Sequence, residues 1–176
     1  MMTTYTFKES LLKSKKIIVV NEQKEECGEI RGTNLKGFEK GNGFIYHPFT
    51  GTPTFLGIKK NGIKRLVQTN YEAKHDEEHY HFSDKLGANF LYFCVLGEIQ
   101  QQSVCFEENW DRHIECKIGG KLFAKIKPNE WTLQTTIEFL EPVDHSTPLF
   151  SITILMSFMY KIYNKEAAFL EDLLFE

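Results

Sequence analysis

Four cationic side chains surround the dipeptide Asn61-Gly62 in the stretch FLGIKKNGIKRLV. Asn-Gly is a strong signal for a two-residue type I′ turn between antiparallel strands. In such a hairpin Lys59 lies opposite Lys64, and like charges facing each other destabilise a strand pair. Either the cations splay into solvent at a tip that also discourages aggregation, or an anion such as a phosphate lies between them. The candidate anion-binding or lipid-binding residues are Lys59, Lys60, Lys64 and Arg65.

Three histidines, His75, His79 and His81, lie in the stretch KHDEEHYHF. On a strand His79 and His81 project to the same side and could bind a divalent metal through their imidazoles. A third ligand would have to come from His75, Asp76 or Glu77. The stretch is highly charged and no cysteine is near it in sequence, so we expect solvent-exposed side chains and neither a metal nor another cofactor.

The sequence contains none of the common catalytic motifs G-x-S-x-G, H-E-x-x-H, G-x-G-x-x-G or the P-loop. His113 with Cys116, or Asp144 with His145, could be combined into a dyad on paper. A chain of this size permits such pairs by chance. We therefore expect a protein that is not an enzyme.

The composition is that of a single globular domain with a sizeable core: 176 residues, 41% apolar, with a net charge of −3. This mild charge gives no general affinity for nucleic acid. The first residues show no basic segment followed by an apolar one, so we expect no secretory signal. Four cysteines form no CxxC pair and are expected to be reduced thiols in a cytoplasmic protein: Cys27, Cys94, Cys105 and Cys116.

The most apolar stretch, STPLFSITILMSFMYKIY, covers residues 146–163. Thr147 can cap a helix, and Pro148 suits its first position. Apolar side chains then cover nearly the whole circumference, leaving a thin polar stripe of Thr153, Ser157 and Lys161. A helix that is apolar on all sides is either buried in a protein or spans a membrane.

The length of this helix decides between the two. Residues 148–163 would span about 24 Å, short of a hydrocarbon core of about 30 Å. We expect a buried core helix over about 148–163, with membrane insertion or docking in a partner's groove as alternatives. Residues 165–176 then form an amphipathic continuation or a second helix.

Nearly everything before Asp144 consists of short β-rich runs bounded by turn residues. The stretch WTLQTTIEFLE shows the alternation of a strand with one buried face. The residues predicted to share that face are Trp131, Leu133, Thr135, Ile137 and Phe139. Counting such runs gives about ten to twelve strands.

The stretch HIECKIGGKLFAKIK predicts a hairpin whose loop length decides which side chains share a face. A two-residue loop, Gly119-Gly120, would put the apolar residues of its two strands on opposite faces. We therefore predict a three-residue loop that includes Lys121. Three pairs then share one face: Ile118 with Leu122, Cys116 with Ala124, and Ile114 with Ile126.

A single helix that is apolar on all sides needs a wall on all sides. A closed antiparallel barrel supplies that wall and removes exposed sheet edges. We predict a single, mainly β domain over residues 1–176: a closed antiparallel β-barrel of about twelve strands, formed by residues 1–143, around the buried C-terminal helix. The rival class is a lipocalin-like carrier of a small hydrophobic ligand, in which the helix lies outside a hollow barrel.

This arrangement resembles the tubby C-terminal-like superfamily, which includes the LURP-one-related proteins and the phospholipid scramblases. The opening YTFKESLLKSKKIIVVNEQKEECGEIRG is similar to the first strands of small bacterial LURP-one-like chains. The hairpin at 113–127 resembles the family's strand–turn–strand unit, and the apolar segment at 146–163 is similar to its central helix. The resemblance implies a twelve-stranded barrel around a C-terminal helix and usually no enzymatic activity.

The chain departs from the scramblase pattern in two ways. Scramblases carry an acidic calcium-binding segment before the last helix, whereas EPVDHSTP offers only Glu141 and Asp144. Two carboxylates are too few for a calcium site of six to eight oxygen ligands. No cysteine cluster suggests palmitoylation, so calcium-triggered scrambling is not expected. Tubby proteins bind phosphoinositides through basic surface residues, but those positions cannot be matched to residues of this chain.

The sequence therefore predicts a non-enzymatic binding or scaffold protein. Its expected ligands are anionic phospholipid head groups or a protein partner at its surface, with no nucleic acid and no transmembrane span. We expect it in the cytoplasm, including the periphery of the membrane.

Overall fold

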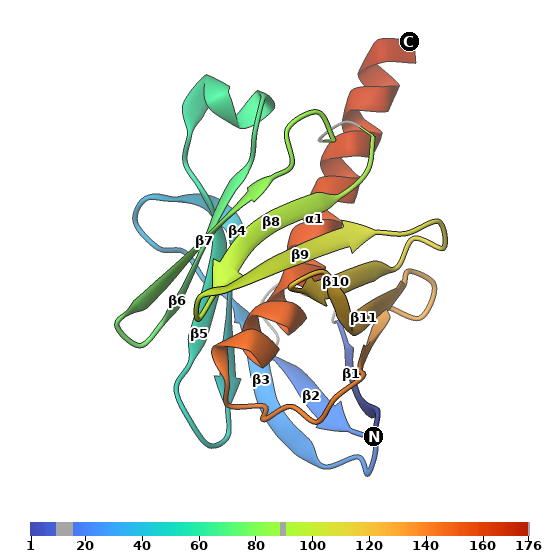
Figure 1. The fold of residues 1–176 in the computed structure, drawn as a ribbon. Coiled ribbons are helices and arrows are strands. Elements are labelled where there is room, and N and C mark those ends of the chain that lie inside the picture. The colour runs from blue at the N-terminus through green and yellow to red at the C-terminus, as the bar shows by residue number, and fades with distance from the viewer. Residues whose placement is uncertain (10–15, 89–90, 176) are drawn as a thin grey trace.

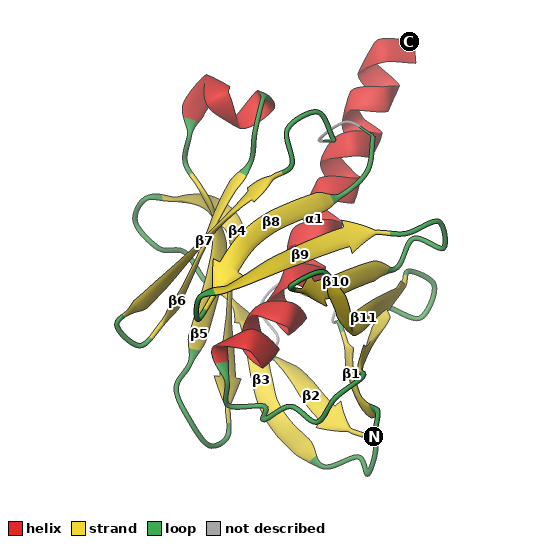
Figure 2. Cartoon of the chain, viewed as in Figure 1, coloured by secondary structure: helices red, strands yellow, loops and turns green. Residues whose placement is uncertain are grey.

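The computed structural model describes residues 1–9, 16–88 and 91–175, which form twelve strands, one short 3-10 helix and one long α-helix (Figures 1 and 2). The first six strands are β1 (Thr3–Lys8), β2 (Ile17–Asn21), β3 (Glu26–Gly32), β4 (Phe38–Pro48), β5 (Thr54–Lys59) and β6 (Asn70–His75). The other six are β7 (Glu78–Asp84), β8 (Cys94–Ile99), β9 (Gln102–Glu108), β10 (Ile114–Ile118), β11 (Lys121–Asn129) and β12 (Gln134–Phe139). The helices are η1 (Gly62–Leu66) and α1 (Pro148–Phe175).

The twelve strands form a closed antiparallel barrel. Each strand pairs with its neighbours in sequence, and β1 pairs with β12 from Thr3 opposite Phe139 to Lys8 opposite Gln134. Alternate side chains point inward, as on β12, where Thr135, Ile137 and Phe139 are buried. The predicted mainly β architecture and the predicted strand number are confirmed.

Helix α1 runs through the barrel and fills its interior (Figure 1). It begins at Pro148, and the Oγ1 of Thr147 accepts a hydrogen bond from the N–H of Phe150 at 3.3 Å, so the predicted cap is confirmed. Every side chain from 150 to 160 is buried. The carrier hypothesis places the helix outside the barrel, whereas here the helix is the core.

Aromatic rings join the helix to the wall around it. Phe150 packs against Tyr5, Tyr46 and Phe139, with ring centroids 4.7 to 5.7 Å apart. The buried hydroxyls of the polar stripe bond to the helix's own backbone; that of Thr153, for example, donates to a carbonyl at 2.7 Å. These hydroxyls are therefore satisfied by carbonyls of the helix itself.

Beyond Tyr160 the helix continues without a break and projects from one end of the barrel. The amphipathic segment at 165–176 is thus a continuation of α1 as far as Phe175, and Glu176 lies outside the described residues. Among the helices in the described part of the chain, none is long and apolar enough to cross a membrane.

The β10–β11 hairpin corrects the predicted loop. Ile118 pairs with Lys121, so the loop contains only Gly119 and Gly120, both with the positive φ that a type I′ turn needs. The register then shifts by one residue at a β-bulge before Ala124. The two pairs farther from the turn, Cys116–Ala124 and Ile114–Ile126, are confirmed, whereas Ile118 does not pair with Leu122. The bulge restores the buried face that a two-residue loop alone would have inverted.

The last strand is shorter than its alternation predicts. Strand β12 begins at Gln134, and the preceding residues form the β11–β12 turn. Leu133 has a φ of 56°, and Trp131 is 98% exposed, so neither continues the buried face. Thr135, Ile137 and Phe139 occupy that face as predicted.

The structure joins none of the four cysteines in a disulfide, and all four lie within the described residues. Cys27, Cys94 and Cys116 are buried, Cys105 is partly buried, and all four are free thiols.

Candidate functional site

The connection between β5 and β6 is not the predicted two-residue turn. It runs from residue 60 to residue 69 and contains η1. Asn61 has a φ of −129°, whereas a type I′ turn needs positive φ at both central residues. Lys59 is therefore not opposite Lys64; it ends β5 and lies near Glu72 of β6.

Two of the four predicted anion-binding cations are engaged with carboxylates of the protein. The Nζ of Lys59 donates to Glu72 at 2.8 Å. Arg65 donates to Glu39 at 3.0 Å, to Thr69 at 2.7 Å and through one nitrogen to both oxygens of Glu166 at 2.8 Å. These contacts tie η1 to α1 and leave Arg65 little capacity for an external anion. Lys60 and Lys64 are exposed.

Glu72 is the centre of a charged network on the outer wall of the barrel. Its side chain is 5% exposed and lies close to Lys59, Lys74, His79 and His81. Burial raises the pKa of Glu72, but hydrogen bonds from Lys59 and His79 and the surrounding positive charge lower it by more, so its net pKa lies below the usual value.

The three histidines that were considered as metal ligands contact other side chains of the protein. The Nδ1 atoms of His79 and His81 lie 3.1 and 3.5 Å from the Glu72 carboxylate, and that of His75 lies 2.8 Å from the Thr54 hydroxyl. In the part of the chain that the structure describes, no group of three His, Cys, Asp or Glu side chains is placed to hold a metal ion.

The barrel has two unlike ends. Because the strands alternate in direction, the β1–β2, β3–β4, β5–β6, β7–β8, β9–β10 and β11–β12 connections lie at the end where α1 leaves the barrel, which we call the helix-exit end. The remaining connections lie at the helix-entry end, near the N-terminus. Figure 1 shows η1, the β7–β8 connection and the projecting part of α1 together, away from the N-terminus.

Large apolar side chains are exposed mainly at the helix-exit end. Ile63 is 85% and Leu91 80% exposed, and Trp110 is fully exposed. The set comprises Leu35, Ile63, Val67, Leu86, Leu91, Trp110 and Trp131 in the connections, and Phe169 and Leu173 on one face of α1. At the helix-entry end, the exposed large apolar residues are Phe49 and Leu140 in the connections, and Met1 and Met2 before β1. A concentration of such residues marks an interaction surface.

Charge follows the same division. Among described residues, the connections of the helix-entry end carry acidic residues and a single lysine: Glu22, Glu25, Asp76, Glu77, Glu141 and Asp144, with Lys24. Those of the helix-exit end carry Lys16, Lys36, Lys60, Lys64, Arg65, Lys85 and Arg112 against Glu9, Asp111 and Glu130. The projecting part of α1 adds Lys161 and Lys165 against Glu166, Glu171 and Asp172. A protein that is acidic overall thus presents a basic, apolar end.

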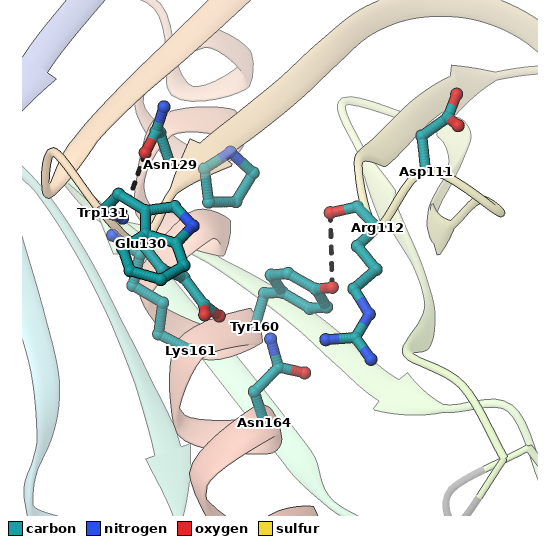
Figure 3. A pocket seen from close by; sticks show the side chains of 9 residues that line it. Asp111, Arg112, Asn129, Glu130, Trp131, Tyr160, Lys161 and Asn164 are labelled. Atoms are coloured by element: carbon teal, nitrogen blue, oxygen red, sulfur yellow. Dashed lines mark hydrogen bonds between the residues drawn. The ribbon is translucent and has the colours of Figure 1, made fainter.

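A pocket of about 320 Å³ opens at the helix-exit end, between the β9–β10 connection, the β11–β12 connection and α1. Trp131 and Arg112 lie on opposite sides of it, with Tyr160 and Asn164 of α1 between them (Figure 3). The side chain of Asp111 points away from Tyr160 in this view.

Two of the three α1 residues that line the pocket, Tyr160 and Lys161, are held by contacts within the protein. The Tyr160 hydroxyl donates to Glu108 at 2.7 Å, and burial raises the pKa of Tyr160, so it remains a donor. The Nζ of Lys161 contacts the Glu9 carboxylate and lies 3.3 Å from the Thr135 hydroxyl. Burial, with the charge of Lys165, lowers the pKa of Lys161 to about 8.

Sequence reasoning missed Trp110, Arg112 and Trp131. Local turn chemistry offered the signal: Asn109 and Asn129 each precede a tryptophan by one or two residues. The Oδ1 of Asn129 accepts hydrogen bonds from the N–H groups of Trp131 and Thr132, both at 3.1 Å, and Asn109 accepts comparable bonds. Such asparagine turns are typical of the connections between strands, and in this protein both tryptophans are exposed.

Comparison with known proteins gives one distant structural likeness. No family model and no curated protein sequence matches this chain. A solved structure of a protein from Arabidopsis thaliana is similar, with a TM-score of 0.49 and 8% identity, over 88% of this chain and 88% of that chain.

Proposed function

We propose that this protein is a non-enzymatic binding protein that attaches to the surface of anionic membranes by its helix-exit end. The observation that carries the proposal is the exposure of large apolar side chains among lysines at this one end. Aromatic and aliphatic side chains enter the membrane interface, and lysines are attracted to anionic head groups. The acidic helix-entry end then faces away from the membrane.

Micromolar binding to a membrane requires both the lysines and the exposed apolar side chains. A basic residue near an anionic surface contributes about 1 kcal/mol, so Lys36, Lys60, Lys64 and Lys85 together give only millimolar binding. Micromolar binding needs about 4 kcal/mol more. Burying a leucine-sized side chain contributes about 1.5 to 3 kcal/mol, so insertion of two or three of the exposed apolar residues supplies the difference.

The tubby-like resemblance supports the proposal without carrying it. The barrel and the C-terminal helix that it implies are present, whereas membership of the superfamily remains a prediction. Tubby proteins, which belong to that superfamily, bind phosphoinositides through basic surface residues. The cation set proposed here is revised: Lys59 and Arg65 stabilise the fold, and Lys60 and Lys64 are joined by Lys36 and Lys85.

The test is co-sedimentation with phosphatidylcholine vesicles that contain increasing amounts of phosphatidylserine, at low and moderate salt. We expect binding that rises with phosphatidylserine and falls with salt. Replacing Lys60, Lys64 and Lys85 by Gln should weaken it about 100-fold, because each contributes about 1 kcal/mol. The double variant Ile63→Ser/Leu91→Ser should also bind more weakly, while its residual binding stays sensitive to salt.

The matched control is Phe49→Ser/Leu140→Ser, which removes exposed apolar side chains from the helix-entry end. This variant should sediment like the wild type. The proposal fails if the wild type does not bind at low salt, or if both apolar variants bind equally well. A protein partner at the same end would then become the leading hypothesis.

A further inference from the structure

The pocket at the helix-exit end is lined by one cation and one anion that have no ion-pair partner among the described residues. Arg112 belongs to the β9–β10 connection and Glu130 to the β11–β12 connection, and both are exposed. The other cation of the lining, Lys161, is engaged with Glu9. Because Asp111 points away from the centre of the pocket, Arg112 and Glu130 are the two charges left to meet a ligand.

These charges lie on different sides of the pocket, and an aromatic face adjoins one of them. Trp131 follows Glu130 in the chain, and its indole lies across the pocket from the Arg112 guanidinium (Figure 3). The indole is 98% exposed, so its face is open to a ligand. A tryptophan face attracts cations, quaternary ammonium groups in particular. A guanidinium binds phosphate oxygens in a bidentate manner.

We propose that this pocket binds a zwitterion of the phosphocholine type. In this arrangement Arg112 binds the phosphate, while Glu130 and the Trp131 indole receive the quaternary ammonium. The amide of Asn164, which lies between the two sides of the pocket, can donate a hydrogen bond to a phosphate oxygen. The volume of about 320 Å³ suits a small ligand, since small-molecule pockets range from about 300 to 1,000 Å³.

The paired charges also predict selectivity. Inorganic phosphate would meet Arg112 but would face the like charge of Glu130, and choline alone would face the like charge of Arg112. A zwitterion satisfies both groups at once. Phosphocholine is therefore expected to bind at least tenfold more tightly than either of its halves.

This inference concerns the same end of the barrel as the proposed membrane attachment, and it names a head group that this end would recognise. The ligand can be free phosphocholine or the head group of a lipid. Binding of the free compound does not depend on a membrane, so the two ideas can be tested apart.

The experiment uses the variant Trp110→Phe, in which Trp131 is the sole tryptophan, because the chain contains two. Its fluorescence is titrated with phosphocholine, choline chloride and sodium phosphate at matched ionic strength. We expect a saturable change with phosphocholine and apparent affinities at least tenfold weaker for the other two. In the same background, Arg112→Gln and Glu130→Gln should each weaken phosphocholine binding about tenfold or more.

The matched control pair is Lys24→Gln and Glu77→Gln, which removes one exposed cation and one exposed anion at the helix-entry end and should leave the titration unchanged. The inference is overturned if choline or phosphate alone gives the same response. It is equally overturned if the Arg112 and Glu130 variants titrate like their parent.

Two further arms identify the source of the ligand and separate this inference from the proposed function. Vesicles of phosphatidylcholine alone should produce the Trp131 change if a lipid supplies the head group, whereas a response to the soluble compound alone assigns free phosphocholine. Ile63→Ser/Leu91→Ser should bind vesicles more weakly and keep the phosphocholine titration. If no soluble titration is seen while anionic vesicles still bind, the pocket inference is wrong and the membrane proposal stands.

Discussion

Glu72 shows how a single residue can determine the role of its neighbours. Its carboxylate is nearly buried and receives Lys59 at 2.8 Å, with Lys74, His79 and His81 around it. Lys59 and Lys74 also lie 5.4 and 5.3 Å from the centre of the Phe38 ring. Lys59, His79 and His81 were candidates for ligand binding in the sequence. In the structure they belong to the charged network around Glu72.

Glu72→Gln should destabilise the protein in a pH-dependent way. The folded-state pKa of Glu72 lies below its ordinary value, so the carboxylate stabilises the fold above about pH 4.5, and this contribution is lost as the pH falls through the folded-state pKa. At pH 7 the variant should lose about 1 to 3 kcal/mol, because charged hydrogen bonds are removed. The difference from the wild type should shrink below pH 4.5. Urea unfolding from pH 3 to 7 measures it, with exposed Glu77→Gln as the control; a constant difference would contradict the network.

At the scale of elements, the sequence was most informative where a pattern strongly favoured one structure. The stretch from Leu149 to Tyr160 is apolar on all sides, and its length favoured burial in the protein over membrane insertion. The β10–β11 hairpin had two solutions, since a three-residue loop and a two-residue loop with a β-bulge bury the same Cys116 and Ala124. Alternation of residues cannot distinguish them.

The β5–β6 connection was mispredicted because its conformation depends on distant residues. Asn61-Gly62 is a local signal, whereas Arg65 is held by Glu39 and Glu166, which lie 26 and 101 positions away. Such contacts cannot be read from spacing along the chain. The pocket was missed for a related reason, because it joins two connections and α1, whose residues are far apart in sequence.

Arg65→Met should loosen the link between η1 and α1. The guanidinium is 17% exposed and has three partners, two of them partly exposed carboxylates. We expect a loss of about 1 to 2 kcal/mol, at the lower end for charged hydrogen bonds because solvent screens the pairs. Faster amide exchange should be confined to η1 and the projecting part of α1. The control Lys64→Met, at an exposed neighbouring residue, should change neither the stability nor the amide exchange. If the Arg65 and Lys64 variants show the same exchange, Arg65 does not join η1 to α1.

At the scale of the whole molecule, the barrel and its helix form one core. Ile154→Asp should abolish soluble folding, because the side chain is fully buried and a charge there would have no partner. The effective cost of several kcal/mol for the buried charge, added to about 2 to 5 kcal/mol for the lost packing, is comparable to the 5 to 15 kcal/mol that typically separates folded from unfolded domains. Soluble expression with circular dichroism measures the result. Leu173→Asp, on the projecting part of the same helix, should fold normally; a soluble Ile154→Asp variant with unchanged melting would contradict the buried helix.

The unlike ends of the barrel determine its expected orientation on a membrane, and the two tryptophans report on it directly. Trp110 and Trp131 both lie at the helix-exit end and are exposed in the free protein. The decisive measurement is tryptophan fluorescence on phosphatidylserine-containing vesicles, with and without brominated lipids. Membrane attachment by this end predicts a blue shift on binding and quenching by bromine near the head groups. Vesicle-bound protein with unshifted, unquenched emission would contradict it.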